Sequence, residues 1–206
     1  MKNAWMLRPF PNEKDAMQEF LDQNLLAVGW SELEDLTGKG REQMEKELVK
    51  VYQLSGQSLG RAKATLDIVV NQMKIGDLIL TPYGEDIHLG QVESVYEYVP
   101  ADKDKGYPHQ RKIHWCSRVS RSDLSEELRG SLRARSTAAN LSKHKVEIQA
   151  LAEGRPVPQT AKKQDTIPLT YPLRPDFMIR MEIPKDMSRE ESERLGTYIK
   201  TLYFTE

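Results

Sequence analysis

Aromatic and basic side chains alternate in one part of the chain, in a pattern suited to binding a flat, polar ligand. Tyr96-Glu97-Tyr98 precedes the run Tyr107-Pro108-His109-Gln110-Arg111-Lys112-Ile113-His114-Trp115. Both flanks have the composition of strands, and residues two apart on a strand share one face of a sheet. Rings beside guanidinium and imidazole groups suit the stacking and hydrogen bonding of a nucleotide. The alternative is that the same rings fill a core.

The charges of the chain are unevenly distributed, although its formal net charge is only −1. Residues 1–104 carry 11 Lys and Arg against 18 Asp and Glu, whereas residues 105–145 carry 10 against 3. Nucleic-acid binding depends on such local basic patches more than on the total charge. A solvated helical surface is the competing interpretation of this basic region.

The motifs of several enzyme classes are absent from the sequence. It contains no Walker-type phosphate loop, no dinucleotide-binding G-x-G-x-x-G after a strand and no G-x-S-x-G nucleophile elbow. Cys116 is the single cysteine, and the four histidines lack metal-ligand spacing. We therefore expect a protein that is not an enzyme and that uses neither a metal nor a cofactor. No apolar run approaches the ~20 residues of a membrane span, so a cytoplasmic protein without membrane contact is expected.

The elements that would position these residues are predicted from hydrophobic periodicity and from turn signals. Strands are expected at residues 4–7, 25–30, 78–81, 87–99 and 111–116, and helices at 12–22, 41–52, 58–73, 123–132 and 140–151. Because the later strands follow one another as hairpins, a mixed or mostly antiparallel sheet is favoured. The predicted fold class is α+β, a small closed or half-closed β-barrel flanked by helices.

The composition predicts one main domain and a small extension. We expect the domain at residues 1–153, a polar, proline-containing linker at 154–166 and a strand-helix extension at 167–206. In the extension, residues 176–184 alternate like a strand, and Ser188 with Glu191 forms a capping box. One strand and one helix bury too little surface to fold alone. The extension should therefore dock on the main domain, on a second copy or on a partner protein.

Four stretches of the main domain together resemble a known superfamily. They are Trp5-Met6-Leu7-Arg8-Pro9, then Ala27-Val28-Gly29-Trp30 with Asp35-Leu36, then Met73-Lys74-Ile75-Gly76-Asp77-Leu78-Ile79-Leu80, and finally the aromatic and basic region that starts near Gly90. Their order and spacing are similar to those of the PUA-like superfamily, and within it to EVE-type domains. The greatest likeness is to the N-terminal modules of modification-dependent restriction proteins of the Mrr type. No nuclease or motor domain follows in this sequence.

The resemblance implies a barrel that captures a flipped, chemically modified base in an aromatic-lined pocket. Extruding a base costs a few kcal/mol, and stacking it on a ring returns about 1–3 kcal/mol. On this basis the expected base-binding residues are Trp30, Asp77, Tyr96, Tyr98, Tyr107 and His109. The expected phosphate-binding residues are Arg111, Lys112, Arg118, Arg121, Arg133 and Arg135.

The leading hypothesis is thus a nucleic-acid-binding reader of a modified base, with modified DNA favoured over RNA, in a bacterial restriction or phage-defence setting. Two alternatives remain open at this point. The first is a non-catalytic module for protein interaction or self-association through the C-terminal extension. The second is a hydrolase that acts on modified nucleotides.

Overall fold

A computed structural model describes residues 2–155 and 166–202 of the chain. The contacts divide the chain into two compact units, Met1–Pro158 and Gln159–Glu206. Most of the expected linker, residues 156–165, falls outside the described residues. Each unit is described by itself below.

A curled, half-barrel sheet forms the centre of the first unit. Its strands follow the order β2-β6-β4-β3-β1-β7, and β5 pairs with β6 beside this path. All described neighbours are antiparallel except β1 and β3, which run parallel. The strands are β1 (Ala4–Leu7), β2 (Leu25–Val28), β3 (Leu78–Tyr83), β4 (Asp86–Val92), β5 (Glu97–Tyr98), β6 (His109–Ser120) and β7 (Ala138–Asn140). The mixed sheet expected from the sequence is confirmed.

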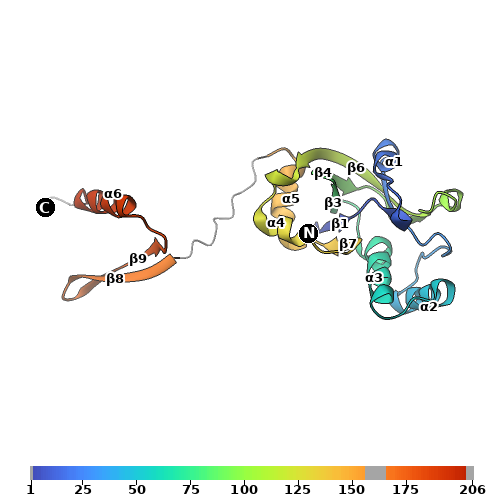
Figure 1. The fold of residues 1–206 in the computed structure, drawn as a ribbon, viewed down its shortest axis with the longest axis horizontal. Helices are drawn as coiled ribbons and strands as arrows, with labels where there is room; N and C mark the ends of the chain where they lie inside the picture. Colours follow the sequence, from blue (N-terminus) through green and yellow to red (C-terminus); the bar gives the residue numbers. More distant parts are fainter. Residues whose placement is uncertain (1, 156–165, 203–206) are drawn as a thin grey trace. The chain divides into compact units, whose positions relative to one another are not determined.

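Helices cover both faces of this sheet. The longer ones are α1 (Met17–Asp22), α2 (Arg41–Tyr52), α3 (Gly56–Asp67), α4 (Glu126–Leu132) and α5 (Lys145–Ala152). Short helical turns are η1 (Pro11–Glu13), η2 (Ile68–Gln72), η3 (Pro100–Asp102), η4 (Arg121–Asp123) and η5 (Ser142–His144). Figure 1 shows α4 and α5 together on one side of the sheet, with α1, α2 and α3 beyond its other side.

The core has two layers because the central strands are buried on both faces. On β1, Trp5 and Leu7 join a cluster with α1, α2 and α3, whereas Ala4 and Met6 join one with α4 and α5. A strand covered on both faces has a continuous apolar sequence instead of an alternating one. The run Ala4–Leu7 follows that rule.

Gly90 interrupts the regular pairing of β4 with β6. The register between β4 and β6 shifts between Leu89 and Gly90, which marks a β-bulge at this glycine. A Cβ atom on Gly90 would lie 2.7 Å from Ile113 Cγ2 and 2.8 Å from the His114 carbonyl oxygen. Only glycine lets β6 approach β4 so closely at this position.

Several predicted boundaries differ from the observed ones. The strand expected at residues 87–99 ends at Val92, and a turn separates it from the two residues of β5. The helix expected at 12–22 is split into η1 and α1. The strand β7, which overlaps the helix expected at 140–151 only at Asn140, was not predicted. In each case contacts between distant segments override the local pattern.

The second unit contains a hairpin and one helix. Strand β8 (Thr166–Arg174) pairs antiparallel with β9 (Phe177–Pro184), and α6 spans Arg189–Lys200. The capping box is confirmed, since the Ser188 amide donates to Glu191 Oε2 and the Glu191 amide to Ser188 Oγ. The expectation of a single strand was wrong, because Pro168 and Pro172 masked the strand character of β8. No helix in residues 2–155 and 166–202 is long and apolar enough to cross a membrane.

Candidate functional site

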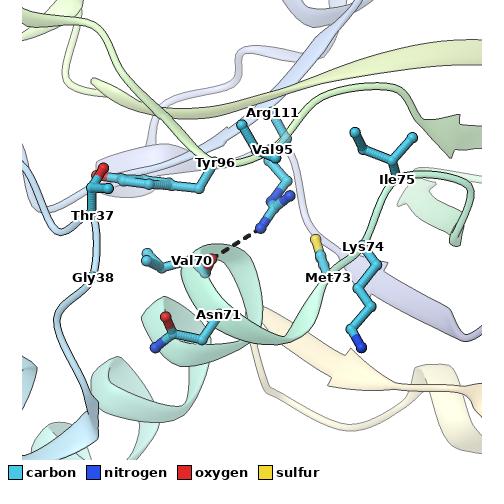
Figure 2. Close-up of a pocket in the computed structure, with 10 residues that line it drawn as sticks. All are labelled: Thr37, Gly38, Val70, Asn71, Met73, Lys74, Ile75, Val95, Tyr96 and Arg111. Carbon is cyan, nitrogen blue, oxygen red and sulfur yellow. Dashed lines mark hydrogen bonds between the residues drawn. The ribbon is translucent and has the colours of Figure 1, made fainter.

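A pocket of about 450 Å³ opens on the first unit where the end of α3 meets β6. Its volume lies in the range of small-molecule sites, ~300–1,000 Å³. The apolar lining comes from Val70, Met73, Ile75, Val95 and Tyr96, and the polar lining from Thr37, Asn71, Lys74 and Arg111 (Figure 2). At the rim, the side chains of Ile75 and Val95 are 62% and 64% exposed. These are large exposures for aliphatic residues that flank a concave site.

An irregular helix end forms one wall of this pocket. Helix α3 continues into the π-helical turn η2, which closes with the Met73 amide donating to the Ile68 carbonyl at 2.9 Å. The last carbonyl groups of a helix lack partners within the helix, so the carbonyls of Val69 and Val70 need donors from elsewhere. Turns of this type are frequent at functional sites.

Arg111 supplies those donors. Its Nε donates to the Val69 carbonyl at 2.6 Å and its Nη2 to the Val70 carbonyl at 3.0 Å, while Nη1 donates to the Ser94 carbonyl at 3.0 Å. Figure 2 shows the guanidinium pointing from β6 toward the end of this helix. A cation at a helix C-terminus also interacts favourably with the helix dipole.

The guanidinium of Arg111 keeps donor capacity for a ligand. Arginine carries five N–H donors, and three are used by the carbonyls of Val69, Val70 and Ser94. Among the described residues, no carboxylate lies within ion-pair distance of Arg111, whose exposure is only 4%. Burial lowers the pKa of Arg111 to about 10, so the group remains protonated at neutral pH. Asp77 and Glu97 act on this cation through their charges only, without forming an ion pair with it. A buried cation without a contacting carboxylate favours a ligand with acceptor atoms or negative charge.

Four of the predicted base-binding residues lie together beside the pocket. His109 is fully buried between the rings of Tyr96 and Tyr98, with centroid distances of 6.0 and 5.5 Å. Tyr96 Oη lies 2.7 Å from His109 Nδ1, and the Trp30 carbonyl lies 3.3 Å from Nε2. These rings pack on one another, and of the four only Tyr96 lines the pocket.

The hydrogen bonds of His109 determine its tautomer. The Trp30 carbonyl can only accept, so Nε2 carries the proton, and Nδ1 accepts from the Tyr96 hydroxyl. The Tyr96 oxygen in turn accepts from the Leu36 amide at 3.3 Å. Burial lowers the pKa of His109 to about 4 and raises the pKa of Tyr96, so both groups are neutral at pH 7.

The backbone at Trp30 adopts a conformation that is rare for a bulky residue. Its φ is +61°, in the left-handed region. Asn12 stabilises this turn, because its Oδ1 accepts from the Trp30 amide at 3.3 Å and its Nδ2 donates to the Gly106 carbonyl at 2.9 Å. A Cβ atom on Gly29 would lie 2.2 Å from Asn12 Oδ1, so this position requires glycine. Trp30 itself is half-buried against the core.

Asp77 and Tyr107, which were also expected to bind a base, have other surroundings. The buried carboxylate of Asp77 accepts from Trp5 Nε1 at 2.8 Å and from the amides of Asn3 and Lys74. Those three donors occupy it, so the structure assigns it the role of joining β1 to the turn before β3. Tyr107 is 2% exposed and packs edge-on against Phe20. Burial, and then the nearby Glu19, raise the pKa of Tyr107 to about 12.

The six predicted phosphate-binding residues do not form one patch. Arg111 is buried, and Lys112 is exposed beside it on β6. Arg118 lies seven residues beyond Arg111 on β6, which is about 23 Å along the strand at ~3.3 Å per residue. Its Nη1 lies 3.6 Å from Asp86 Oδ2. The other three are Arg121, which donates to the Gly84 carbonyl, and the exposed Arg133 and Arg135.

Arg118, Arg121, Arg133 and Arg135 are called the second basic region here, and Arg8 holds part of it in place. Its guanidinium donates to the carbonyls of Leu132, Ala134 and Ser136, the segment that carries Arg133 and Arg135. Burial, and then the nearby charge of Arg121, lower the pKa of Arg8. Four of the six cations expected to bind phosphate therefore lie toward the far end of β6, whereas Arg111 and Lys112 lie at the pocket.

Some pocket residues were not predicted as site residues. Val70, Asn71 and Met73 were assigned to a regular amphipathic helix, and the π-helical turn that brings them to the pocket has no recognisable sequence signal. The sequence gives a weak signal for a site at Lys74 and Ile75. An apolar residue such as Ile75, in the turn at Gly76, has no core to enter. Within residues 2–155 and 166–202, no group of three or more His, Cys, Asp or Glu side chains could hold a metal ion.

Comparison with known proteins gives a family but no activity. No curated protein matches the chain. A family model with the description "Domain of unknown function (DUF8426)" matches residues 5–142, which include the whole pocket and all of the first unit's sheet except Ala4. The match spans more than half of the sequence, and the chain therefore belongs to this DUF8426 family.

Proposed function

We propose that the first unit is a non-enzymatic nucleic-acid-binding module that reads a modified base in the pocket above Arg111. The observation that carries this proposal is the buried, protonated guanidinium with unused N–H donors at the base of an apolar-walled pocket. Arginine donors commonly read the carbonyl and ring-nitrogen acceptors on the edge of a base. Val70, Met73 and Tyr96 offer apolar surface to its faces.

The curled sheet with helices on both faces is compatible with a PUA-like barrel, and the proposal places the chain in that superfamily. The exposed Ile75 and Val95 at the rim would contact the neighbouring nucleotide or the modifying group. Their apolar character suits an alkyl modification, because burying each added methyl group contributes about 0.8 kcal/mol. A restriction or phage-defence role, in a bacterial cytoplasm, is the setting proposed for such a reader.

The second basic region supports binding of a polymer over binding of a free nucleotide. Its distance from Arg111, about 23 Å along β6, corresponds to roughly seven steps of a nucleic-acid strand at ~3.4 Å each. Arg118, Arg121, Arg133 and Arg135 would then bind phosphates on a strand whose target base enters the pocket. Modified DNA remains our preferred ligand.

A binding panel tests the proposal. Full-length protein is titrated with DNA and RNA oligonucleotides that carry one modified base or its unmodified counterpart, at two salt concentrations. We expect one modified oligonucleotide to bind at least tenfold more tightly than its counterpart. The slope of log K against log salt should be about −0.9 per duplex phosphate contact, or −0.7 for a single strand. Equal affinity for all oligonucleotides, with no dependence on salt, would refute the proposal.

A further inference from the structure

The prolines of the C-terminal hairpin reveal which of its main-chain groups face outward. In an antiparallel pair, hydrogen-bonded residue pairs alternate with pairs whose N–H and C=O groups point away from the neighbouring strand. Pro168 lies opposite Glu182, and Pro172 opposite Met178. Because proline has no N–H group, both pairs are of the outward-pointing type. Arg180 lies two residues from both Met178 and Glu182 on β9, so its main-chain N–H and C=O groups point outward as well.

The two edges of this hairpin therefore differ. Along β8, Pro168 and Pro172 remove two of the outward donors, which is a common way to block strand addition. Along β9, the consecutive outward positions Met178, Arg180 and Glu182 all keep an N–H group, and only the terminal outward position, Pro184, lacks one. Within residues 2–155 and 166–202, β9 pairs only with β8. The β9 edge is thus the one able to accept another strand.

The same hairpin has an apolar face whose residues are exposed on β8 and half-buried on β9. Ile167, Leu169 and Tyr171 of β8 lie opposite Ile183, Met181 and Ile179 of β9. Tyr171 is 60% exposed, and no residue among 166–202 is buried. An isolated two-stranded hairpin is marginally stable in water, and it gains stability from additional strands or from packing against a helix. Because Ile167, Leu169 and Tyr171 remain exposed beside α6, additional strands would stabilise this unit further.

We propose that β9 pairs antiparallel with β9 of a second copy of this chain, with the two-fold axis at Met181. In this register Arg180 lies opposite Glu182 of the second copy, and Glu182 lies opposite its Arg180. A two-fold axis at Arg180 would place the two arginines opposite each other, and an axis at Glu182 the two glutamates. Opposite charges across strands stabilise a sheet and like charges destabilise it, so the charges select the axis at Met181.

The resulting dimer has one four-stranded sheet, in the strand order β8-β9-β9-β8. Its apolar face is continuous, because Met181 meets Met181 of the second copy and Ile179 meets Ile183. Both outer edges are β8 strands with their prolines, so the sheet closes as a dimer and does not extend to a fibre. The occupant of the β9 edge is thus a second copy of this chain.

Charge exchange tests the proposed register. We expect full-length Arg180→Glu and Glu182→Arg each to raise the dimer dissociation constant about tenfold or more, because two favourable pairs become two repulsive ones. An equimolar mixture of the two variants should dimerise like the wild type, since every contact between positions 180 and 182 is again between opposite charges. Sedimentation equilibrium measures the masses. A monomeric wild type, single variants that dimerise normally, or a mixture that stays monomeric would overturn the proposal.

Cross-linking provides a second test that does not depend on charge. In a Cys116→Ser background, Met181→Cys should form an intermolecular disulfide under mild oxidation, because facing residues of this pair type have Cα atoms about 4.5 Å apart. Ile179→Cys is the matched control on the same face of the same strand. Its counterpart across the axis is Ile183, so it should not cross-link to itself. Equal cross-linking of both variants, or none with Met181→Cys, would exclude an axis at Met181.

Discussion

Burial of His109 should make the stability of the first unit depend on pH. Its imidazole is fully buried and neutral, with Nδ1 accepting from Tyr96 and a pKa lowered to about 4. The unfolded chain has the ordinary value of about 6.5 and binds the proton more readily. Between these values the unfolded state carries more protons, so the free energy of unfolding falls as the pH is lowered.

The magnitude follows from the shift in pKa. A difference of about 2.5 units at ~1.36 kcal/mol per unit corresponds to about 3 kcal/mol, lost between pH 7 and pH 4. We expect His109→Leu to be less stable than the wild type at pH 7, because Tyr96 loses its acceptor. Its free energy of unfolding should nevertheless fall less steeply with acid. His88 and His144, whose pKa values are also lowered by burial, are present in both proteins and cancel in the comparison.

Urea denaturation followed by tryptophan fluorescence measures this difference. All three tryptophans of the chain, Trp5, Trp30 and Trp115, lie in the first unit, so the signal reports the unit that contains His109. Transitions are recorded from pH 7 to pH 4.5 for both proteins. Identical pH dependence of the two free energies of unfolding would show that His109 is not held neutral by burial.

Three further substitutions test the structural contacts around the pocket, each by urea denaturation. Trp5→Phe removes the donor to Asp77 Oδ2 and should lower the free energy of unfolding by about 1.5–3 kcal/mol, the range for hydrogen bonds to charged groups. A loss below about 0.5 kcal/mol would contradict the role assigned to Asp77. Gly90→Ala should lower the free energy of unfolding by about 1–3 kcal/mol through steric overlap. The control Gly130→Ala, which has open space around it, should not destabilise the protein. Similar effects of both substitutions would contradict the close packing at the bulge. Arg111→Met should cost about 3 kcal/mol, because the carbonyls at the end of η2 lose their donors; an unchanged stability would contradict that contact.

Local sequence patterns predicted the regular elements well. The helix expected at 41–52 matches α2, and the Ser188 capping box begins α6 as expected. The bulge at Gly90 fits the same kind of local signal, since a glycine within a strand often marks such a site. These features depend on residues close together in the sequence. Strand β8 was missed because its prolines argued against a strand, although they only exclude a central one.

The pocket could be predicted only in part. Tyr96, Tyr98 and His109 lie together with the Trp30 carbonyl beside them, but the sequence could not show that these three rings contact one another. Arg111 was expected at the surface, as for most arginines. Its burial depends on carbonyl groups at the end of a helix some forty residues earlier in the chain. A local pattern carries no information on such a contact.

One comparison tests the proposed function most directly. Val95→Glu places a carboxylate at the rim of the pocket that contains Arg111, where it competes for the unused donors and repels phosphate. Val146→Glu is the matched control, since Val146 is 62% exposed on α5 and lies outside the pocket lining. We predict that Val95→Glu weakens binding of the preferred modified oligonucleotide about tenfold or more, while Val146→Glu binds within about twofold of the wild type. Equal affinities of the two variants would contradict a reading pocket at Arg111.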